Sequence, residues 1–166
     1  FQYNENKFLE KCKKSKVDGL IVVDLPYPEN KNFALKCKKY KISFIQLLSP
    51  TTSKIRQKKI IKDSHDMIYY ISMLSTTGGE LKVSPRKIMQ EYQKIKKQNK
   101  SKNIVIGFGI TEKTISLLKK ADGLVVGSAI CKEINNSIKR GQNTVTNVTN
   151  VVRRLKNKIK WTGLPK

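Results

Sequence analysis

The residues best suited to bind a ligand lie in two glycine turns, Gly107–Ile110 (GFGI) and Gly127–Ile130 (GSAI). Each turn follows a run of β-branched residues and precedes a pattern that predicts a helix. A strand, a glycine turn and a helix start together direct backbone N–H groups toward an anion. Two such turns in consecutive units are typical of the phosphate site that follows the seventh and eighth strands of a (β/α)8 barrel.

Several of these residues have a physical reason to be at an anion site. Glycine at Gly107, Gly109 and Gly127 removes Cβ atoms that would keep a phosphate away from the backbone. Ser128 adds a hydroxyl donor at a helix start. The Gly-Phe-Gly phrase alone is equally consistent with a tight turn, so the prediction depends on the two turns together. No Gly-x-Gly-x-x-Gly motif occurs, which excludes the usual dinucleotide fingerprint.

Three further segments follow predicted strands and carry polar groups. Ser72–Glu80 contains two glycines and several hydroxyls, a composition typical of a loop that closes over a ligand. Asp24 is either a functional carboxylate at the end of a strand or the organiser of a turn. The hydroxyls of Ser49–Thr52 lie near the same predicted edge, and they either face a ligand or belong to a simple cap of the helix that starts at Ser53.

The charge of the chain is strongly positive. Its 166 residues include 35 Lys and Arg against 12 Asp and Glu, which gives a formal net charge of +23. Such a charge suits a nucleic-acid-binding protein, but the lysines fall on every predicted helix and loop. They are not interleaved with aromatic residues as a stacking surface requires. We therefore expect the lysines to be substitutions at solvent-exposed positions, as in proteins from AT-rich genomes. We expect no specific nucleic-acid partner.

The sequence predicts no metal site, no disulfide and no membrane segment. Cys12, Cys37 and Cys131 are far apart, and His65 has no ligand-type neighbours at metal-binding spacing. No apolar stretch reaches the length of a membrane span, and the N-terminus does not resemble a signal peptide. We expect a cytoplasmic protein that binds no cofactor and no membrane.

Apolar runs alternate with helical patterns along the chain. The five runs are 20–23, 43–48, 67–71, 104–106 and 124–126. They are nearly continuous, as expected of strands buried on both faces. The alternation predicts one α/β domain, residues 1–166, with a parallel sheet and helices outside it. A barrel of this class needs eight strands, so five strands indicate either an open sheet or a barrel without its first three βα units.

The helical patterns have recognisable starts and ends. One helix is entered through Ser84 and Pro85, an N-cap followed by proline at the first helical position. Another is expected over Thr111–Lys120, with Thr111 as its cap. A strongly basic helix is expected at about 145–159, at the C-terminal end of the chain.

Five phrases of the sequence resemble those of tryptophan synthase alpha subunits in both order and spacing. The phrases are Asp18–Pro26, Ser49–Thr52, Ile68–Ser72 with Thr77–Gly78, Gly107–Ile110 and Asp122–Ile130. The resemblance covers about residues 1–133, and it implies the C-terminal portion of a (β/α)8 TIM barrel that lacks the first three strands.

The resemblance also implies a function. The family is a lyase of tryptophan biosynthesis that cleaves indole-3-glycerol phosphate to indole and glyceraldehyde 3-phosphate. Its partner is a beta subunit that carries pyridoxal phosphate and receives the indole, in a heterotetramer of two alpha and two beta subunits. No cofactor is implied for the alpha subunit itself.

The substrate contacts are implied residue by residue. They are Tyr70, Thr77, Gly78, Gly107, Phe108, Gly109, Gly127 and Ser128. The glycines and Ser128 would hold the phosphate, Tyr70 and Phe108 would border the indole and glycerol groups, and Thr77 would orient the catalytic acid when its loop closes.

The chain departs from the family at the chemical centre. The two carboxylates that the family uses for acid–base work lie upstream of any segment in this sequence, and Asp24 matches a different family position. No catalytic residue is therefore assigned, and this chain alone is expected to be inactive. An alternative function is a non-catalytic remnant that binds phosphate or the beta subunit.

Overall fold

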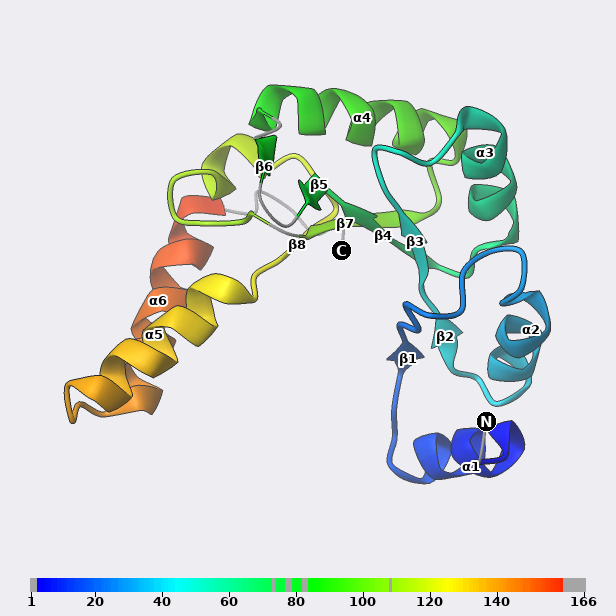
Figure 1. Cartoon of the computed structure of the whole chain (residues 1–166), viewed down its shortest axis with the longest axis horizontal. Helices are drawn as coiled ribbons and strands as arrows, with labels where there is room; N and C mark the ends of the chain where they lie inside the picture. Colours follow the sequence, from blue (N-terminus) through cyan, green and yellow to red (C-terminus); the bar gives the residue numbers. More distant parts are fainter. Residues whose placement is uncertain (1–2, 73, 77–78, 82–83, 108, 160–166) are drawn as a thin grey trace, which may run out of the picture.

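The parallel strands lie side by side in the order of the chain (Figure 1). The computed structural model describes residues 3–72, 74–76, 79–81, 84–107 and 109–159. The first pair is β1 (Gly19–Leu20) with β2 (Ser43–Phe44), and the larger sheet has the order β3 (Gln46–Leu48), β4 (Met67–Ile71), β7 (Asn103–Gly107), β8 (Gly123–Val125). Only Ile45 separates β2 from β3, so one run of chain pairs with β1 on one side and with β4 on the other.

Helices follow these strands as the alternation predicts. They are α1 (Glu5–Lys14), α2 (Lys31–Lys39), α3 (Lys54–Asp63), α4 (Pro85–Gln98), α5 (Ser128–Lys139) and α6 (Thr144–Ile159). Figure 1 shows α3 and α4 on the outer side of the strands, and α5 and α6 as a pair that extends away from them. The α/β class, the parallel strands and the basic C-terminal helix are thereby confirmed.

Side chains cap the starts of four of these helices. Asn4, Ser53 and Ser84 accept hydrogen bonds from amides of the first turns of α1, α3 and α4. Asn143 accepts a hydrogen bond from the Thr146 amide in the first turn of α6. Pro85 occupies the first turn of α4, where its missing N–H costs nothing. The signals read in the sequence at residues 84 and 85 therefore determine where α4 begins.

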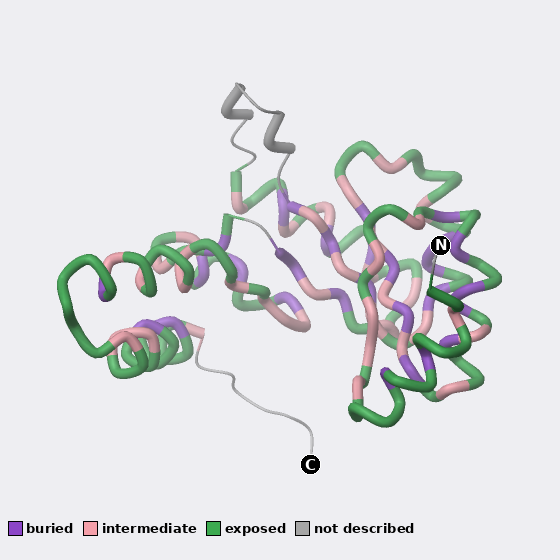
Figure 2. The backbone as a smooth tube through the Cα atoms, turned by 60° about the horizontal axis from the view of Figure 1, so that its bottom comes forward, coloured by how far each residue is buried: buried purple, intermediate pink, exposed green. Residues whose placement is uncertain are grey.

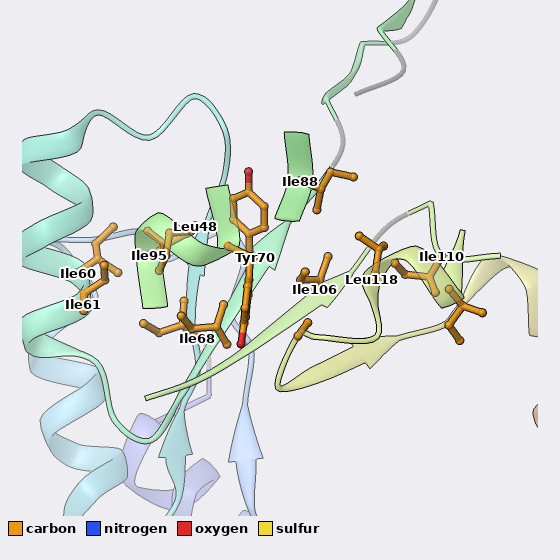
Figure 3. Close-up of a cluster of buried hydrophobic side chains, with 14 of the residues drawn as sticks. Leu48, Ile60, Ile61, Ile68, Tyr70, Ile88, Ile95, Ile106, Ile110 and Leu118 are labelled. Atoms are coloured by element: carbon orange, nitrogen blue, oxygen red, sulfur yellow. The ribbon is translucent and has the colours of Figure 1, made fainter. Parts of the chain in front are cut away.

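The core lies between the sheet and its outer helices. Along β4 and β7, alternate residues up to Ile106 are buried, and Ile104 belongs to the same core cluster as residues of α3 and α4. Figure 3 shows Ile68, Tyr70 and Ile106 in this cluster. A smaller cluster joins α1 and α2 to β2 through residues such as Leu9 and Phe44. Figure 2 shows the buried positions concentrated along the strands and on the helices that cover them.

Three expectations about local structure are wrong. The run 20–23, expected to be a buried strand, is a strand only at its start, because β1 ends at Leu20, and Ile21 and Val23 are exposed. The segment expected to be a helix over Thr111–Lys120 contains only the 3-10 helix η1 (Ile115–Leu118). Hydroxyls of Thr111 and Thr114 bond to nearby backbone groups and to each other, which competes with regular helix formation. The segment expected to be a loop contains the short antiparallel pair β5 (Leu74–Thr76) and β6 (Gly79–Leu81).

Asp122 connects the strands that carry the two glycine turns. Its Oδ2 accepts a hydrogen bond from the Ile104 amide at 2.8 Å and one from the Lys96 ammonium at 2.9 Å. One carboxylate thus links β7, α4 and the residue before β8. The acid in the phrase Asp122–Ile130 therefore has a structural role.

We expect Asp122→Ala to lower the free energy of unfolding by about 1–3 kcal/mol, because the Ile104 amide and the Lys96 ammonium lose a shared acceptor. Urea unfolding measures the change. Glu10→Ala is the matched control, since Glu10 is exposed and has no ion pair among the described residues. A loss no larger than that of the control would contradict the role assigned to Asp122.

Candidate functional site

The two glycine turns meet at one hollow of about 220 Å³. It is lined by Gly109 and Ile110 after β7, by Val125, Gly127 and Ser128 at and after β8, and by Tyr69 of β4. Their meeting follows from the strand register, which aligns Ile71 of β4, Gly107 of β7 and Val125 of β8. Parallel strands bring their carboxyl ends to the same edge of a sheet, so the turns that follow them are neighbours.

Gly107 has a different role from the one expected. A Cβ at this position would lie 1.8 Å from the Tyr69 hydroxyl oxygen and 2.2 Å from its ring carbon Cζ. The ring of Tyr69 therefore lies across the backbone of Gly107, in the space that a side chain would fill. The absence of a side chain at Gly107 makes room for Tyr69, and Gly107 itself does not line the hollow.

The turn after β7 is held by hydroxyl groups. Gly109 has a φ of 67°, a conformation that favours glycine. The Thr114 hydroxyl donates to the Gly109 carbonyl at 3.0 Å, and the Ser72 hydroxyl donates to the Gly107 carbonyl at 2.6 Å. These bonds fix the carbonyl groups on either side of the turn.

The turn after β8 begins helix α5. Gly127 is the N-cap, and its carbonyl accepts from the amides of Ile130 and Cys131 at 2.9 and 3.1 Å. No side chain of the described residues caps this helix start, so its first amides remain available to an anion. A Cβ at Gly127 would meet nothing within 4 Å, which shows that the space beside it is open.

The hollow is uncharged and only partly polar. None of the residues that the structure places around it carries a carboxylate or an ammonium group. Burial raises the pKa of the Tyr69 hydroxyl, so this group stays protonated at neutral pH and can donate a hydrogen bond. The arrangement can bind an anion through amides and hydroxyls, and it supplies no acid–base group of its own.

The sequence assigned the wrong tyrosine to this region. Tyr70 is 2% exposed and belongs to the core against α4 (Figure 3), where burial raises its pKa to about 12. Its neighbour Tyr69 lines the hollow instead. Successive side chains of a strand point to opposite faces of the sheet. An assignment that is wrong by one residue therefore names a core residue in place of a site residue. Thr77, Gly78 and Phe108 lie outside the described residues, and their roles stay predictions.

A second hollow of about 470 Å³ lies beside the turn after β3. The hydroxyls of Ser49, Thr51 and Thr52 bond to one another at its wall, while Ser53 caps α3. Each of the two alternatives predicted for Ser49–Thr52 is therefore partly correct. Ser53 alone caps the helix, and the hydroxyls of Ser49–Thr52 line the hollow. Asp24 lies exposed in the turn after β1, which ends at Leu20, and is not part of the wall.

The wall of this second hollow contains a buried polar pair that the sequence did not reveal. The Asn30 amide donates to Gln46 Oε1 at 2.9 Å, and the Gln46 amide donates back to Asn30 Oδ1 at 3.3 Å. Both residues are no more than 3% exposed. The pair joins the segment before α2 to β3. Nothing in the local sequence links residues that are so far apart along the chain.

Comparisons with known proteins give a family for this arrangement of turns. The family model described as tryptophan synthase alpha chain matches residues 1–160. The tryptophan synthase alpha chain of Pelagibacter ubique (strain HTCC1062) is 75% identical over 159 residues, which are 96% of this chain and 60% of that protein. The chain belongs to the tryptophan synthase alpha chain family.

Solved structures agree with this family. A tryptophan synthase alpha chain from Legionella pneumophila has a TM-score of 0.83 at 28% identity, over 99% of this chain and 60% of the other. A structure of the tryptophan synthase complex from Pyrococcus furiosus has a TM-score of 0.76 at 29% identity, over 93% and 60% of the two chains. The chain thus spans about 60% of the length of these three relatives, and its fold is a partial barrel of this family.

Two further observations on the structure concern membranes and metals. No helix in the described ranges is both long and apolar enough to cross a lipid bilayer. No group of three or more His, Cys, Asp or Glu side chains in those ranges could hold a metal ion.

We expect Gly107→Ala to lower the free energy of unfolding by about 1–3 kcal/mol, because the added methyl group displaces the ring of Tyr69. The cost should fall when the same change is made in a Tyr69→Ala background, with a coupling energy of about 0.5–3 kcal/mol. Urea unfolding of the four proteins measures this cycle. Equal costs in the two backgrounds would show that Tyr69 does not require glycine at this position.

Proposed function

We propose that this chain is part of a tryptophan synthase alpha subunit, a lyase that cleaves indole-3-glycerol phosphate to indole and glyceraldehyde 3-phosphate in tryptophan biosynthesis. The observation that carries the proposal is the hollow shared by Gly109, Gly127 and Ser128, in a chain of this family. A phosphate fits there because backbone amides at a helix start and a serine hydroxyl bind anions without a lysine or arginine.

The remaining contacts follow from the same hollow. The phosphate would lie between the turn at Gly109 and the start of α5, and the Tyr69 hydroxyl would face the rest of the substrate from β4. Thr77, Gly78 and Phe108 keep the roles that the family resemblance assigns to them. Burial of the phosphate against amides orients the substrate, which leaves the acid–base work to carboxylates elsewhere.

A beta subunit is the proposed partner. The Pyrococcus furiosus structure that matches this chain is titled as a tryptophan synthase complex. We propose the same kind of assembly here, with two alpha and two beta subunits in the cytoplasm. Pyridoxal phosphate would belong to the beta subunit, and this chain would bind no cofactor.

A second function has one observation in its favour. No carboxylate lines the hollow in the described part of the chain. A polypeptide limited to these residues would bind phosphate esters or a beta subunit without turning over substrate. The two functions differ in one measurable property, which is the release of indole.

We expect the 166-residue chain to release no indole from indole-3-glycerol phosphate. A fusion that adds the part of the Pelagibacter ubique relative not matched by this chain should release it, because that part would supply the missing carboxylates. Indole is measured directly in solution, with the added part alone as the control. Indole release by the 166-residue chain would contradict the assignment of the acids, and a folded but inactive fusion would favour the non-catalytic function.

We expect Gly127→Ala to weaken binding of glycerol 3-phosphate at least about tenfold, or 1.4 kcal/mol, because the methyl group occupies the open space beside the phosphate. Stability should change by less than about 0.5 kcal/mol, since the backbone φ of −114° suits any residue. Calorimetric titration and urea unfolding measure the two quantities.

The control for this substitution should change stability and leave affinity for glycerol 3-phosphate nearly unchanged. Ser53→Ala removes the cap of α3 and should cost about 1 kcal/mol of stability, with affinity for glycerol 3-phosphate changed less than about twofold. If Gly127→Ala leaves the affinity unchanged, the phosphate does not lie at the start of α5.

A further inference from the structure

A third hollow, of about 410 Å³, lies at the edge of the sheet opposite to the candidate site. Its lining residues precede the strands or begin them: Asp18 comes before β1, Ser43 begins β2, Asp66 comes before β4 and Lys102 comes before β7. These strands are parallel, so the hollow is at their amino ends, whereas Gly109 and Gly127 follow their carboxyl ends. We name it the basal hollow.

The basal hollow contains more positive than negative charge. Lys38 of α2, Lys41 after α2 and Lys102 all line it. None of the three has a carboxylate within 4.0 Å among the described residues, although several other lysines of this chain do. Asp18 and Asp66 also line the hollow, and neither forms an ion pair with a described residue. Three ammonium groups therefore face two carboxylates.

His65 presents a hydrogen-bond donor in the same place. Its Nδ1 accepts a hydrogen bond from the Phe44 amide at 3.0 Å, so in the neutral ring the proton is on Nε2. Burial and the neighbouring Lys38 ammonium lower the pKa of His65, which keeps the ring neutral at pH 7. Lys102 donates to the carbonyls of Ser64 and His65, both at 2.7 Å, and so fixes the segment that carries the ring.

Ser43 adds a group without a partner. Its hydroxyl oxygen is buried, and within the described residues it has no hydrogen-bond partner. A buried hydroxyl of this kind normally finds a partner in the protein or in a bound molecule. Ser43 lines the basal hollow together with the three lysines and His65.

We propose that the basal hollow binds a small oxyanion of the size of inorganic phosphate. Lys38 and Lys41 supply the attraction, Lys102 holds the wall, and the donors of His65 and Ser43 orient the ion. No metal-binding group of side chains is present in the described ranges, and the excess of positive charge disfavours a cation. The hollow suits a compact ion, because its donors come from three separate segments around one space.

The site is separate from the proposed substrate site in position and in chemistry. The substrate phosphate would be held by uncharged amides after β7 and β8, whereas the basal ion would be held by lysines at the other end of the strands. An ion that binds only the folded chain stabilises it in proportion to the logarithm of its concentration. The basal ion therefore favours the packing of α2 and β2 against the segment 64–66 that precedes β4.

The imidazole of His65 makes the test specific, because it is the only histidine in the sequence. We titrate the 166-residue chain with sodium phosphate at pH 7.5 and follow the NMR signals of this ring, with sodium chloride at equal ionic strength as the reference. We expect a saturable shift with phosphate and none with chloride. Phosphate that binds only beside Gly127 would leave the signals of His65 unchanged.

Variants separate a built site from general attraction to a basic protein. Lys38→Gln with Lys41→Gln should weaken the phosphate affinity reported by His65 at least about fivefold, since two ammonium groups are lost from the hollow. Lys13→Gln with Lys39→Gln is the matched control, because it removes the same charge from exposed positions outside the hollow and should change the affinity less than about twofold.

Two outcomes overturn the proposal. One is the absence of a saturable shift of His65 in the unaltered chain, and the other is an equal loss of affinity in both pairs of variants. Ser43→Ala provides a variant that keeps every charge, and it should weaken the affinity about two- to fivefold through the lost donor. Lys102 is left unchanged because its two bonds to backbone carbonyls support the local fold.

Discussion

The register of three parallel strands is the constraint on which the rest of the structure depends. Because Ile71, Gly107 and Val125 are aligned across β4, β7 and β8, the two glycine turns open at one edge. The same register places Tyr69 opposite Val105 and lets its ring cross the bare backbone of Gly107. A shift by one residue would exchange the buried side chains of β4 for the half-buried ones. The site and the core are thus fixed by one set of backbone hydrogen bonds.

The two ends of the sheet differ in how they can attract an anion. After β7 and β8 the available groups are amides and hydroxyls, which act over short distances and depend on exact placement of the turn by Thr114 and Ser72. At the amino ends the available groups are lysines, whose attraction acts over longer distances and is screened by salt. The net charge of +23 belongs to the whole chain, so it does not indicate where a phosphate site lies. In this chain the best candidate for the substrate phosphate has no charged lining.

Much of the fold could be predicted from the sequence because buried parallel strands are nearly continuous apolar runs. The runs at 43–48, 67–71 and 104–106 became strands, and Ser84 with Pro85 began α4 as expected. One of the two failures at 72–81 and 111–120 occurred where side chains bond to nearby backbone groups. Thr111 and Thr114 replaced a regular helix with a turn and the 3-10 helix η1, and the polar segment after Ser72 formed a short antiparallel pair. Local hydrogen bonds of this kind are not visible as hydrophobic periodicity.

The site could be predicted only as far as the backbone determines it. Glycine turns that follow neighbouring parallel strands are expected to lie side by side. The sequence Tyr69-Tyr70, in contrast, does not show which ring faces the core, because the residues on both sides of the pair are apolar. Catalytic residues of barrels come from the ends of several strands, whereas a phosphate site of this kind needs only two neighbouring ones. A chain that contains β7 and β8 can therefore hold a whole anion site while it spans about 60% of its relatives' length. Under the proposed function, binding and chemistry would be separable because they would depend on different strands.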